Sequence, residues 1–117
     1  MAHTPSPIWS AKLVQMLSGM LHLHRTAKAI LVLCAEVREK LSVREIAERL
    51  RLSERSVRKH LAPLLSKGLL AREVAVTKAK RLSYRYYLPP IDAVLAKLKR
   101  EMQNRIATIE KAARSAA

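Results

Sequence analysis

Glycine, cysteine and acidic residues are scarce in this sequence of 117 residues. It contains two glycines, one cysteine, no phenylalanine and only nine aspartates and glutamates. Two separate glycines do not make the glycine-rich loop that cradles phosphates in nucleotide-binding proteins. The single cysteine, Cys34, excludes a disulfide framework and a zinc site built from cysteines. No nucleophile stands beside a base and no carboxylates are paired, so we expect a protein that is not an enzyme and needs no cofactor.

Long apolar runs are also missing. No run approaches the roughly 18–20 residues of a membrane span, and the N-terminus lacks the charged-then-apolar order of a secretory signal. Half of the residues are nevertheless apolar, which suffices for one hydrophobic core. We therefore expect a single-domain intracellular protein without a membrane partner.

Positive charge is what the sequence has in excess. Lysine and arginine number 23, and the formal net charge is +14. Such a charge points to a polyanionic partner, either nucleic acid or an anionic membrane face. Residues 51–88 hold ten basic and two acidic residues, and this clustering favours nucleic acid.

Apolar residues three and four positions apart predict two helices in the N-terminal third. The first is expected to start at Pro7 with Ser6 as its N-cap, and to place these residues on one face: Trp9, Leu13, Met16, Leu17 and Met20. The second is expected from Thr26, as its cap, to about residue 40, with Cys34 as a small core residue. His22 and His24, together with Cys34 or His3, do not make a plausible ligand set, so we expect no metal.

The middle of the chain predicts two short helices joined by a tight turn. Ser42 and Glu45 have the spacing of a capping box, and Ala47 is small enough for a second helix to cross closely. Ser53 is expected to cap that second helix, and Gly68 stands where a C′ glycine belongs. Two helices in this arrangement form a helix-turn-helix.

The second of these helices is expected to present a basic stripe. With Val57 facing inward, Arg55, Lys59 and Ala62 point to the opposite side at about 100° per residue. Ser56 and Arg58 flank this stripe. Arginine in such a position can bind guanine through two hydrogen bonds in the major groove. The simpler interpretation is an ordinary solvated face.

Residues 70–88 change to the alternation of a β-hairpin. One run includes Leu70, Val74 and Val76, and the other includes Tyr84, Tyr86 and Leu88, with a basic tip at residues 77–81 between them. We expect one face of this hairpin to pack on the core. Base stacking by the tyrosines is the alternative interpretation.

The segment LSVREIAERLRLSERSVRKHLAPLLSKGLL resembles the winged helix-turn-helix of small prokaryotic transcription regulators of the ArsR, MarR and TrmB types. The continuation KAKRLSYRYYLPP, followed by a long helix, resembles small archaeal members that dimerise through that helix. The resemblance implies that the capped second helix reads the major groove and that the hairpin, or wing, touches the minor groove or backbone. It nominates Ser53, Arg55, Ser56, Arg58 and Lys59 on the helix, and Lys78, Lys80, Arg81 and Arg85 on the wing.

Two positions depart from the resemblance. Arg51 occupies a turn position that is often glycine, and a non-glycine residue with positive φ costs roughly 1 kcal/mol there. Pro63 lies inside the second helix, where it removes a backbone hydrogen bond and favours a kink. The wing cations also have a simpler interpretation, as charges that keep a hairpin edge soluble.

The last helix is expected from Ile91 to about Ser115, with apolar residues in a heptad pattern typical of a coiled coil. Its predicted dimer interface comprises Ile91, Leu95, Leu98, Met102, Ile106 and Ile109, with Ile106 replacing the charged Arg105. Packing of this helix against the N-terminal helix of the same chain is the alternative.

The predicted fold is mainly α with a small β-hairpin wing. We expect an N-terminal tail and helix at 1–26, a winged helix-turn-helix at 27–88 and a dimerisation helix at 89–117. The expected function is that of a homodimeric transcription regulator that binds specific double-stranded DNA and lies in the cytoplasm on the nucleoid. An architectural DNA protein, a protein-interaction module and an RNA-binding protein are the rival hypotheses. The sequence does not indicate whether a small effector binds.

Overall fold

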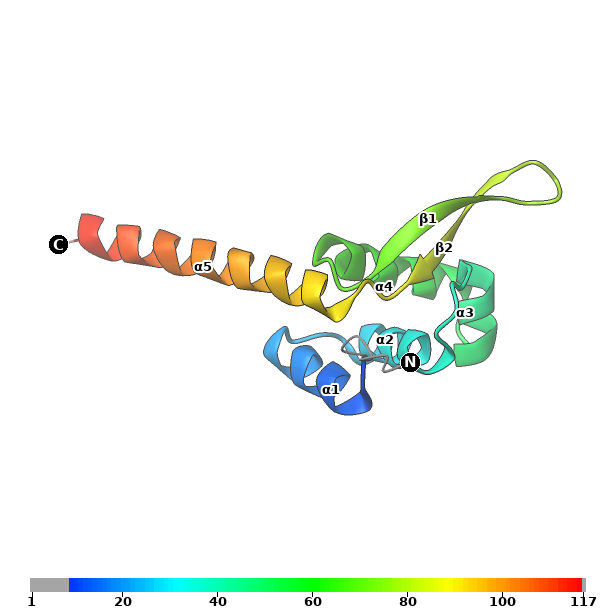
Figure 1. Cartoon of the computed structure of the whole chain (residues 1–117), viewed down its shortest axis with the longest axis horizontal. Coiled ribbons are helices and arrows are strands. Elements are labelled where there is room, and N and C mark those ends of the chain that lie inside the picture. Colours follow the sequence, from blue (N-terminus) through cyan, green and yellow to red (C-terminus); the bar gives the residue numbers. More distant parts are fainter. Residues whose placement is uncertain (1–8, 117) are drawn as a thin grey trace, which may run out of the picture.

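The structure, a computed structural model, describes residues 9–116 and confirms a mainly helical fold with one β-hairpin. Its elements, in chain order, are α1 (Ala11–Met20), α2 (Arg25–Val37), α3 (Val43–Leu50), α4 (Glu54–Ser66), β1 (Ala71–Val76), β2 (Leu82–Tyr87) and α5 (Ile91–Ser115). The described chain measures 61 × 43 × 26 Å, because the hairpin and α5 project in opposite directions from the helical body (Figure 1). Among the described helices, none combines the length and apolar character needed to cross a membrane.

The starts of the first two helices differ from the prediction. Helix α1 begins at Ala11, where the Ser10 side chain accepts a hydrogen bond from the Leu13 N–H. The predicted cap at Ser6 and Pro7 lies outside the described residues. Trp9 precedes the helix instead of joining its apolar face. Helix α2 is capped by His24, whose Nδ1 accepts from the Thr26 N–H at 3.1 Å, so the prediction of Thr26 as the cap was wrong.

The helix-turn-helix forms as predicted. Ser42 and Glu45 make the reciprocal hydrogen bonds of a capping box at the start of α3. The Ser53 side chain accepts from the Ser56 N–H at the start of α4. Between the helices, Arg51 has φ +56°, so this arginine occupies the left-handed conformation that often calls for glycine. Helix α4 continues past Pro63 to Ser66.

The core lies between α2, α3 and α4, and α2 is central to it. Ile30 and Leu31 of α2 are fully buried beside Ile46 of α3 and Leu64 of α4. Ala47 and Cys34 are also buried, which confirms both as core residues. In α1, Val14 and Leu17 reach this core, but Met16 and Met20 are exposed, contrary to the predicted apolar face.

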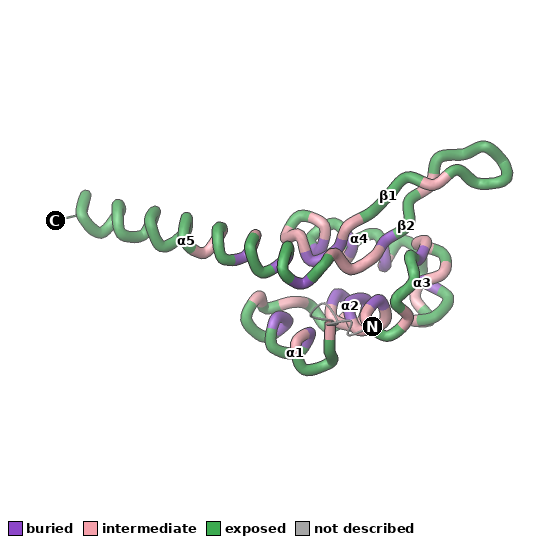
Figure 2. Tube along the Cα trace, viewed as in Figure 1, coloured by how far each residue is buried: buried purple, intermediate pink, exposed green. Residues whose placement is uncertain are grey.

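The hairpin is attached to the body only at its base. β1 and β2 are antiparallel, and Leu41 bridges to Tyr86 on the outer side of β2. Tyr86 is buried in the core, which confirms a half-buried strand at that position. The same prediction was wrong for Val74 and Val76, because the outer half of the hairpin extends beyond the helices (Figure 2).

Helix α5 has an attached part and a projecting part. Ile91, Val94 and Leu98 are buried against their own chain, and Lys97 Nζ donates to the Ser66 carbonyl at 3.2 Å. Ile91 and Leu98 are therefore inaccessible to a second chain, unlike the other residues of the predicted dimer interface. Every described residue from 103 onward is exposed (Figure 2).

Replacing each of the two glycines with alanine should change the free energy of unfolding in opposite directions. Gly68 has φ +75°, and an added Cβ would lie 2.6 Å from Lys97 Cδ. Gly68→Ala should therefore lower the free energy of unfolding by about 1–2 kcal/mol. Gly19 lies within α1 with no atom near its added Cβ, so Gly19→Ala should raise that free energy by about 0.5–1 kcal/mol. Urea unfolding of both variants checks the pair, and a stabilising Gly68→Ala would contradict it.

Candidate nucleic-acid interface

Helix α4 buries one stripe and exposes the opposite one. Val57, Leu61 and Leu64 face the core, and all three are buried. Arg55 and Lys59 are exposed, as the helical wheel predicted. A helix has the right width for the major groove of B-form DNA, so this basic face is available to a duplex.

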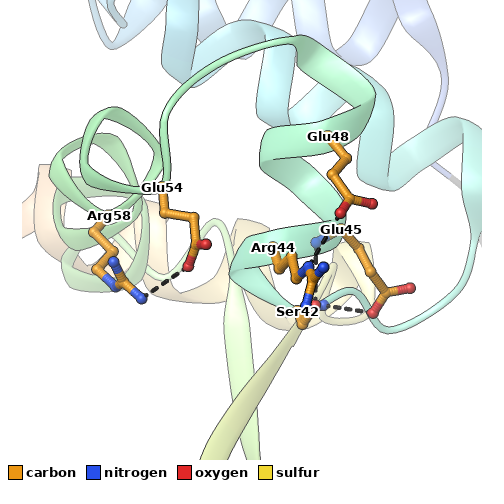
Figure 3. A network of polar contacts seen from close by, with 6 residues as sticks. All are labelled: Ser42, Arg44, Glu45, Glu48, Glu54 and Arg58. Carbon is orange, nitrogen blue, oxygen red and sulfur yellow. Dashed lines mark hydrogen bonds and ion pairs between the residues drawn. The ribbon is translucent and has the colours of Figure 1, made fainter.

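Arg58 also lies on α4, but it is already paired. Its Nη2 lies 3.1 Å from Glu54 Oε1, one helical turn earlier (Figure 3). Both side chains are exposed, and exposed pairs of this kind contribute only about 0.3–0.5 kcal/mol. A phosphate or a base can therefore displace Glu54 from Arg58 at small cost. While the ion pair is intact, Glu54 fixes the direction of the Arg58 guanidinium.

A second arginine, which the sequence analysis did not select, lies at the start of α3. Arg44 Nε is 3.1 Å from Glu48 Oε1, and this pair is drawn beside the capping box in Figure 3. In that box the hydrogen bond from the Ser42 N–H lowers the pKa of the Glu45 carboxyl. A cation inside a capping box, on the helix that precedes the predicted recognition helix, is the sequence signal that would have identified Arg44.

A groove of about 470 Å³ separates the wing from the two helix starts. Arg44 and Arg58 line its helical side, and Arg85 lines its wing side. Arg85 is anchored at the base of the wing, because its Nη1 donates to the Lys40 carbonyl at 3.4 Å and lies 4.0 Å from Glu45 Oε1. The structure thus brings Arg58 and Arg85, both predicted from sequence, to one groove.

The wing tip presents the other predicted cations. Lys78, Lys80 and Arg81 are exposed at the end of the hairpin, apart from the groove. The tip is held by Thr77, whose N–H donates to the Arg81 carbonyl and whose side chain accepts from the Arg81 N–H. Lys80 has φ +57°, which completes the turn.

Two tyrosines of the wing are covered by cations of the same chain. The Arg72 guanidinium lies 4.1 Å from the centre of the Tyr84 ring, and Lys40 Nζ lies 5.0 Å from that of Tyr87. Lys40 also pairs with Glu73 at 2.8 Å. Each of these rings therefore has one face in contact with a cation of its own chain.

Two of the histidines, His24 and His60, form a stacked pair. The rings of His24 and His60 lie 4.5 Å apart at 21°. Burial, with the nearby charges of His24 and Lys59, lowers the pKa of His60, so His60 adds little positive charge to α4 near neutral pH. Within residues 9–116, no three histidine, cysteine, aspartate or glutamate side chains are grouped so as to hold a metal. His3, the other residue considered as a ligand, lies outside the described residues. Burial raises the pKa of the Cys34 thiol to about 11.

Comparison with known proteins agrees with this geometry. Residues 24–71 match the family model described as winged helix-turn-helix DNA-binding. No curated protein matches the sequence.

Solved structures from archaea share the fold. A possible transcriptional regulator from Methanosarcina mazei is similar with a TM-score of 0.62 and 15% identity, over 86% of this chain and 87% of that one. A protein of Sulfolobus tokodaii has a TM-score of 0.57 and 23% identity, over 85% and 92%. The transcriptional regulator BldR of Sulfolobus solfataricus has a TM-score of 0.51 and 19% identity, over 83% and 70%. The chain therefore has the winged helix-turn-helix fold, and its residues 24–71 match the DNA-binding model of that name.

Proposed function

We propose that the protein is a homodimeric transcription regulator that binds specific double-stranded DNA. Helix α4 enters the major groove, and the wing lies on the minor groove or the backbone. Phosphate contacts supply most of the affinity, and base contacts from α4 supply the specificity. A protein with this role acts in the cytoplasm, on the nucleoid.

The observation that carries this proposal is the arrangement of cations on three elements. Arg55 and Lys59 on α4, Arg44 on α3 and the cations of the wing tip are all exposed. Arg44 and Arg58 also border the groove between helices and wing. A basic surface formed by a recognition helix and a wing is the electrostatic footprint of a DNA-binding protein.

The homodimer is supported by an apolar stripe along α5 that its own chain does not cover. Leu95, Ile106 and Ile109 are exposed apolar residues, and Met102 is partly exposed on the same stripe. The exposed part of α5, from residue 103 to Ser115, is short enough to be only marginally stable in water unless its apolar face is packed. A second copy of α5 supplies that packing.

Selection of bound sequences from random duplex DNA tests the proposal. A homodimer should select a palindrome whose half-sites are about 34–36 Å apart, one turn of DNA. Selection without any preferred sequence would favour an architectural protein. Failure to retain duplex DNA, while RNA is retained, would favour an RNA-binding protein.

Substitutions in α4 and the wing should have different effects. Arg58→Ala should weaken binding to the selected site by about 1–3 kcal/mol and relax its sequence preference. Lys78→Ala should weaken binding to all duplexes alike and reduce the salt dependence by about one phosphate contact. Fluorescence anisotropy with specific and random duplexes measures both effects.

Arg114→Ala is the matched control. Arg114 pairs with Glu110 at 3.5 Å and is exposed on a helix, as Arg58 is with Glu54, but it lies at the far end of α5. Arg114→Ala should leave the sequence preference of DNA binding unchanged. Equal effects of Arg58→Ala on specific and random duplexes would contradict base reading. No effect of either Arg58→Ala or Lys78→Ala would favour a protein-interaction module.

A further inference from the structure

The outer half of the wing carries four apolar side chains on one face, all exposed. Val74 is the register partner of Tyr84, and Val76 is that of Leu82. Paired residues on antiparallel strands share a face, and so do residues two positions apart. The exposed fractions are 61% for Val74, 40% for Tyr84, 68% for Val76 and 78% for Leu82.

This apolar face borders the proposed DNA site. Val76, Leu82 and Tyr84 line the same groove as Arg58 of the recognition helix. The strands that carry them stand clear of the helical body and are exposed along their outer half (Figure 2). The chain's own core therefore does not cover them.

Strand propensity does not explain the choice of residues. Valine favours strands, but leucine is not among the strong strand formers, and threonine provides the same preference with a polar group. Leu82 is nevertheless the most exposed of the large apolar residues within the described part of the chain. Its position next to the tip is therefore better explained by a contact with a partner.

The charges around the face indicate the chemistry of that partner. Residues 71–88 contain five basic residues and one acidic residue. Three of these cations, Lys78, Lys80 and Arg81, lie in the tip between Val76 and Leu82. Val76 and Leu82 can contact apolar groups while the cations of the tip bind negative charges beside them. A suitable partner is therefore a polyanion that has apolar groups between its charges. The minor groove of DNA has this character, with phosphates outside and sugars and stacked bases within.

We propose that Val76 and Leu82 form a wedge that enters the minor groove and partly unstacks one base step. The cations of the tip bind the phosphates on either side of it. This inference rests on the proposed DNA-binding function and adds a second source of specificity. Apolar wedges in other proteins kink DNA by about 20–90°. The kink is easiest at pyrimidine–purine steps such as TA, so the wing favours deformable sequence without reading base edges.

The test uses the full chain and two duplexes of roughly 20–30 base pairs. They differ only at the centre, where one has a TA step and the other a stiff A-tract, and each carries a dye at both ends. Energy transfer reports the bend, and anisotropy at low salt reports the affinity. The unmodified protein should bend the TA duplex and bind it about tenfold more tightly than the A-tract duplex.

Two variants remove the wedge and keep every charge. Leu82→Ser should abolish most of the bend and reduce the tenfold preference to nearly none. Val76→Thr, which keeps a branched strand former, should reduce both effects partly. Met16→Ser is the matched control, because Met16 is an exposed apolar residue on α1, and it should change neither. Circular dichroism checks that the variants fold.

Three results would overturn the inference. An unchanged bend with Leu82→Ser and Val76→Thr, while both bind DNA, would refute the wedge and leave the proposed function standing. Failure of the unmodified protein to bind either duplex would refute both. If Leu82→Ser lowers the mass measured by sedimentation and leaves the bend unchanged, the face is a contact between copies and the wedge is wrong.

Discussion

Raising the salt concentration from about 50 to about 200 mM should weaken binding to duplex DNA by about 10³–10⁵-fold. This range applies to proteins that contact roughly 6–10 phosphates. The estimate is reasonable here because Arg55, Lys59 and the three cations of the wing tip are exposed. A homodimer presents each of them twice. Each neutralised phosphate releases counterions, and added salt opposes that release.

A titration across this range, read by anisotropy, measures the slope of log affinity against log salt. The double variant with Lys78→Ala and Arg81→Ala removes two cations from each wing. Its slope should fall by about two for each wing that contacts the DNA. Lys111→Ala, on the projecting part of α5, is the control and should leave the slope unchanged. An affinity independent of salt would rule out binding through the basic surface.

Replacing Ile106 and Ile109 together with aspartate should convert the proposed dimer to a monomer. The exposed fractions of these side chains are 56% and 67%, so neither supports the core of its own chain. Each fully buried side chain of this kind contributes roughly 1.5–3 kcal/mol. The proposed dimer would bury four on each chain, namely Leu95, Met102, Ile106 and Ile109. The dimer dissociation constant should therefore rise by about 10³-fold or more.

Analytical ultracentrifugation at micromolar concentration measures the change. Asn104→Asp adds one negative charge on the opposite side of α5 and should leave the proposed dimer intact. The double variant should still fold, and should bind a single half-site while losing most of its affinity for a palindrome. The homodimer would be wrong if the unmodified chain were monomeric, and the interface would be wrong if the double variant stayed dimeric.

Local signals in the sequence predicted the helix-turn-helix and the wing well. Ser42, Ser53 and Gly68 are caps whose hydrogen bonds or φ angles depend only on neighbouring residues. The hairpin tip at residues 77–81 also agrees with the strand ends at Val76 and Leu82. These features need no long-range contact to form, so their residue types reveal them.

Features that depend on distant contacts were not predictable in the same way. Alternation in the strands does not tell how far a hairpin extends beyond the body, so the exposure of Val74 and Val76 was missed. The heptad pattern of α5 likewise does not tell which part packs on its own chain, and Leu98 belongs to that part. Arg58 was selected for its position, but its pairing with Glu54 reduces its free charge. Whether these residues contact DNA stays a prediction.

The indole of Trp9 connects the two ends of the folded body. Its Nε1 donates to the Pro89 carbonyl at 2.9 Å, across 80 positions of sequence. The entropic cost of closing a loop rises by about 0.6 kcal/mol for each doubling of the number of residues in it. Closing this loop therefore costs about 2–3 kcal/mol more than closing the five-residue tip of the wing. We therefore expect the contacts of Trp9 to form late in folding, after the local helix pairs and the hairpin. Since Trp9 is the only tryptophan, its fluorescence should report the joining of the α1 start to the wing–α5 junction, and not the assembly of the helix-turn-helix.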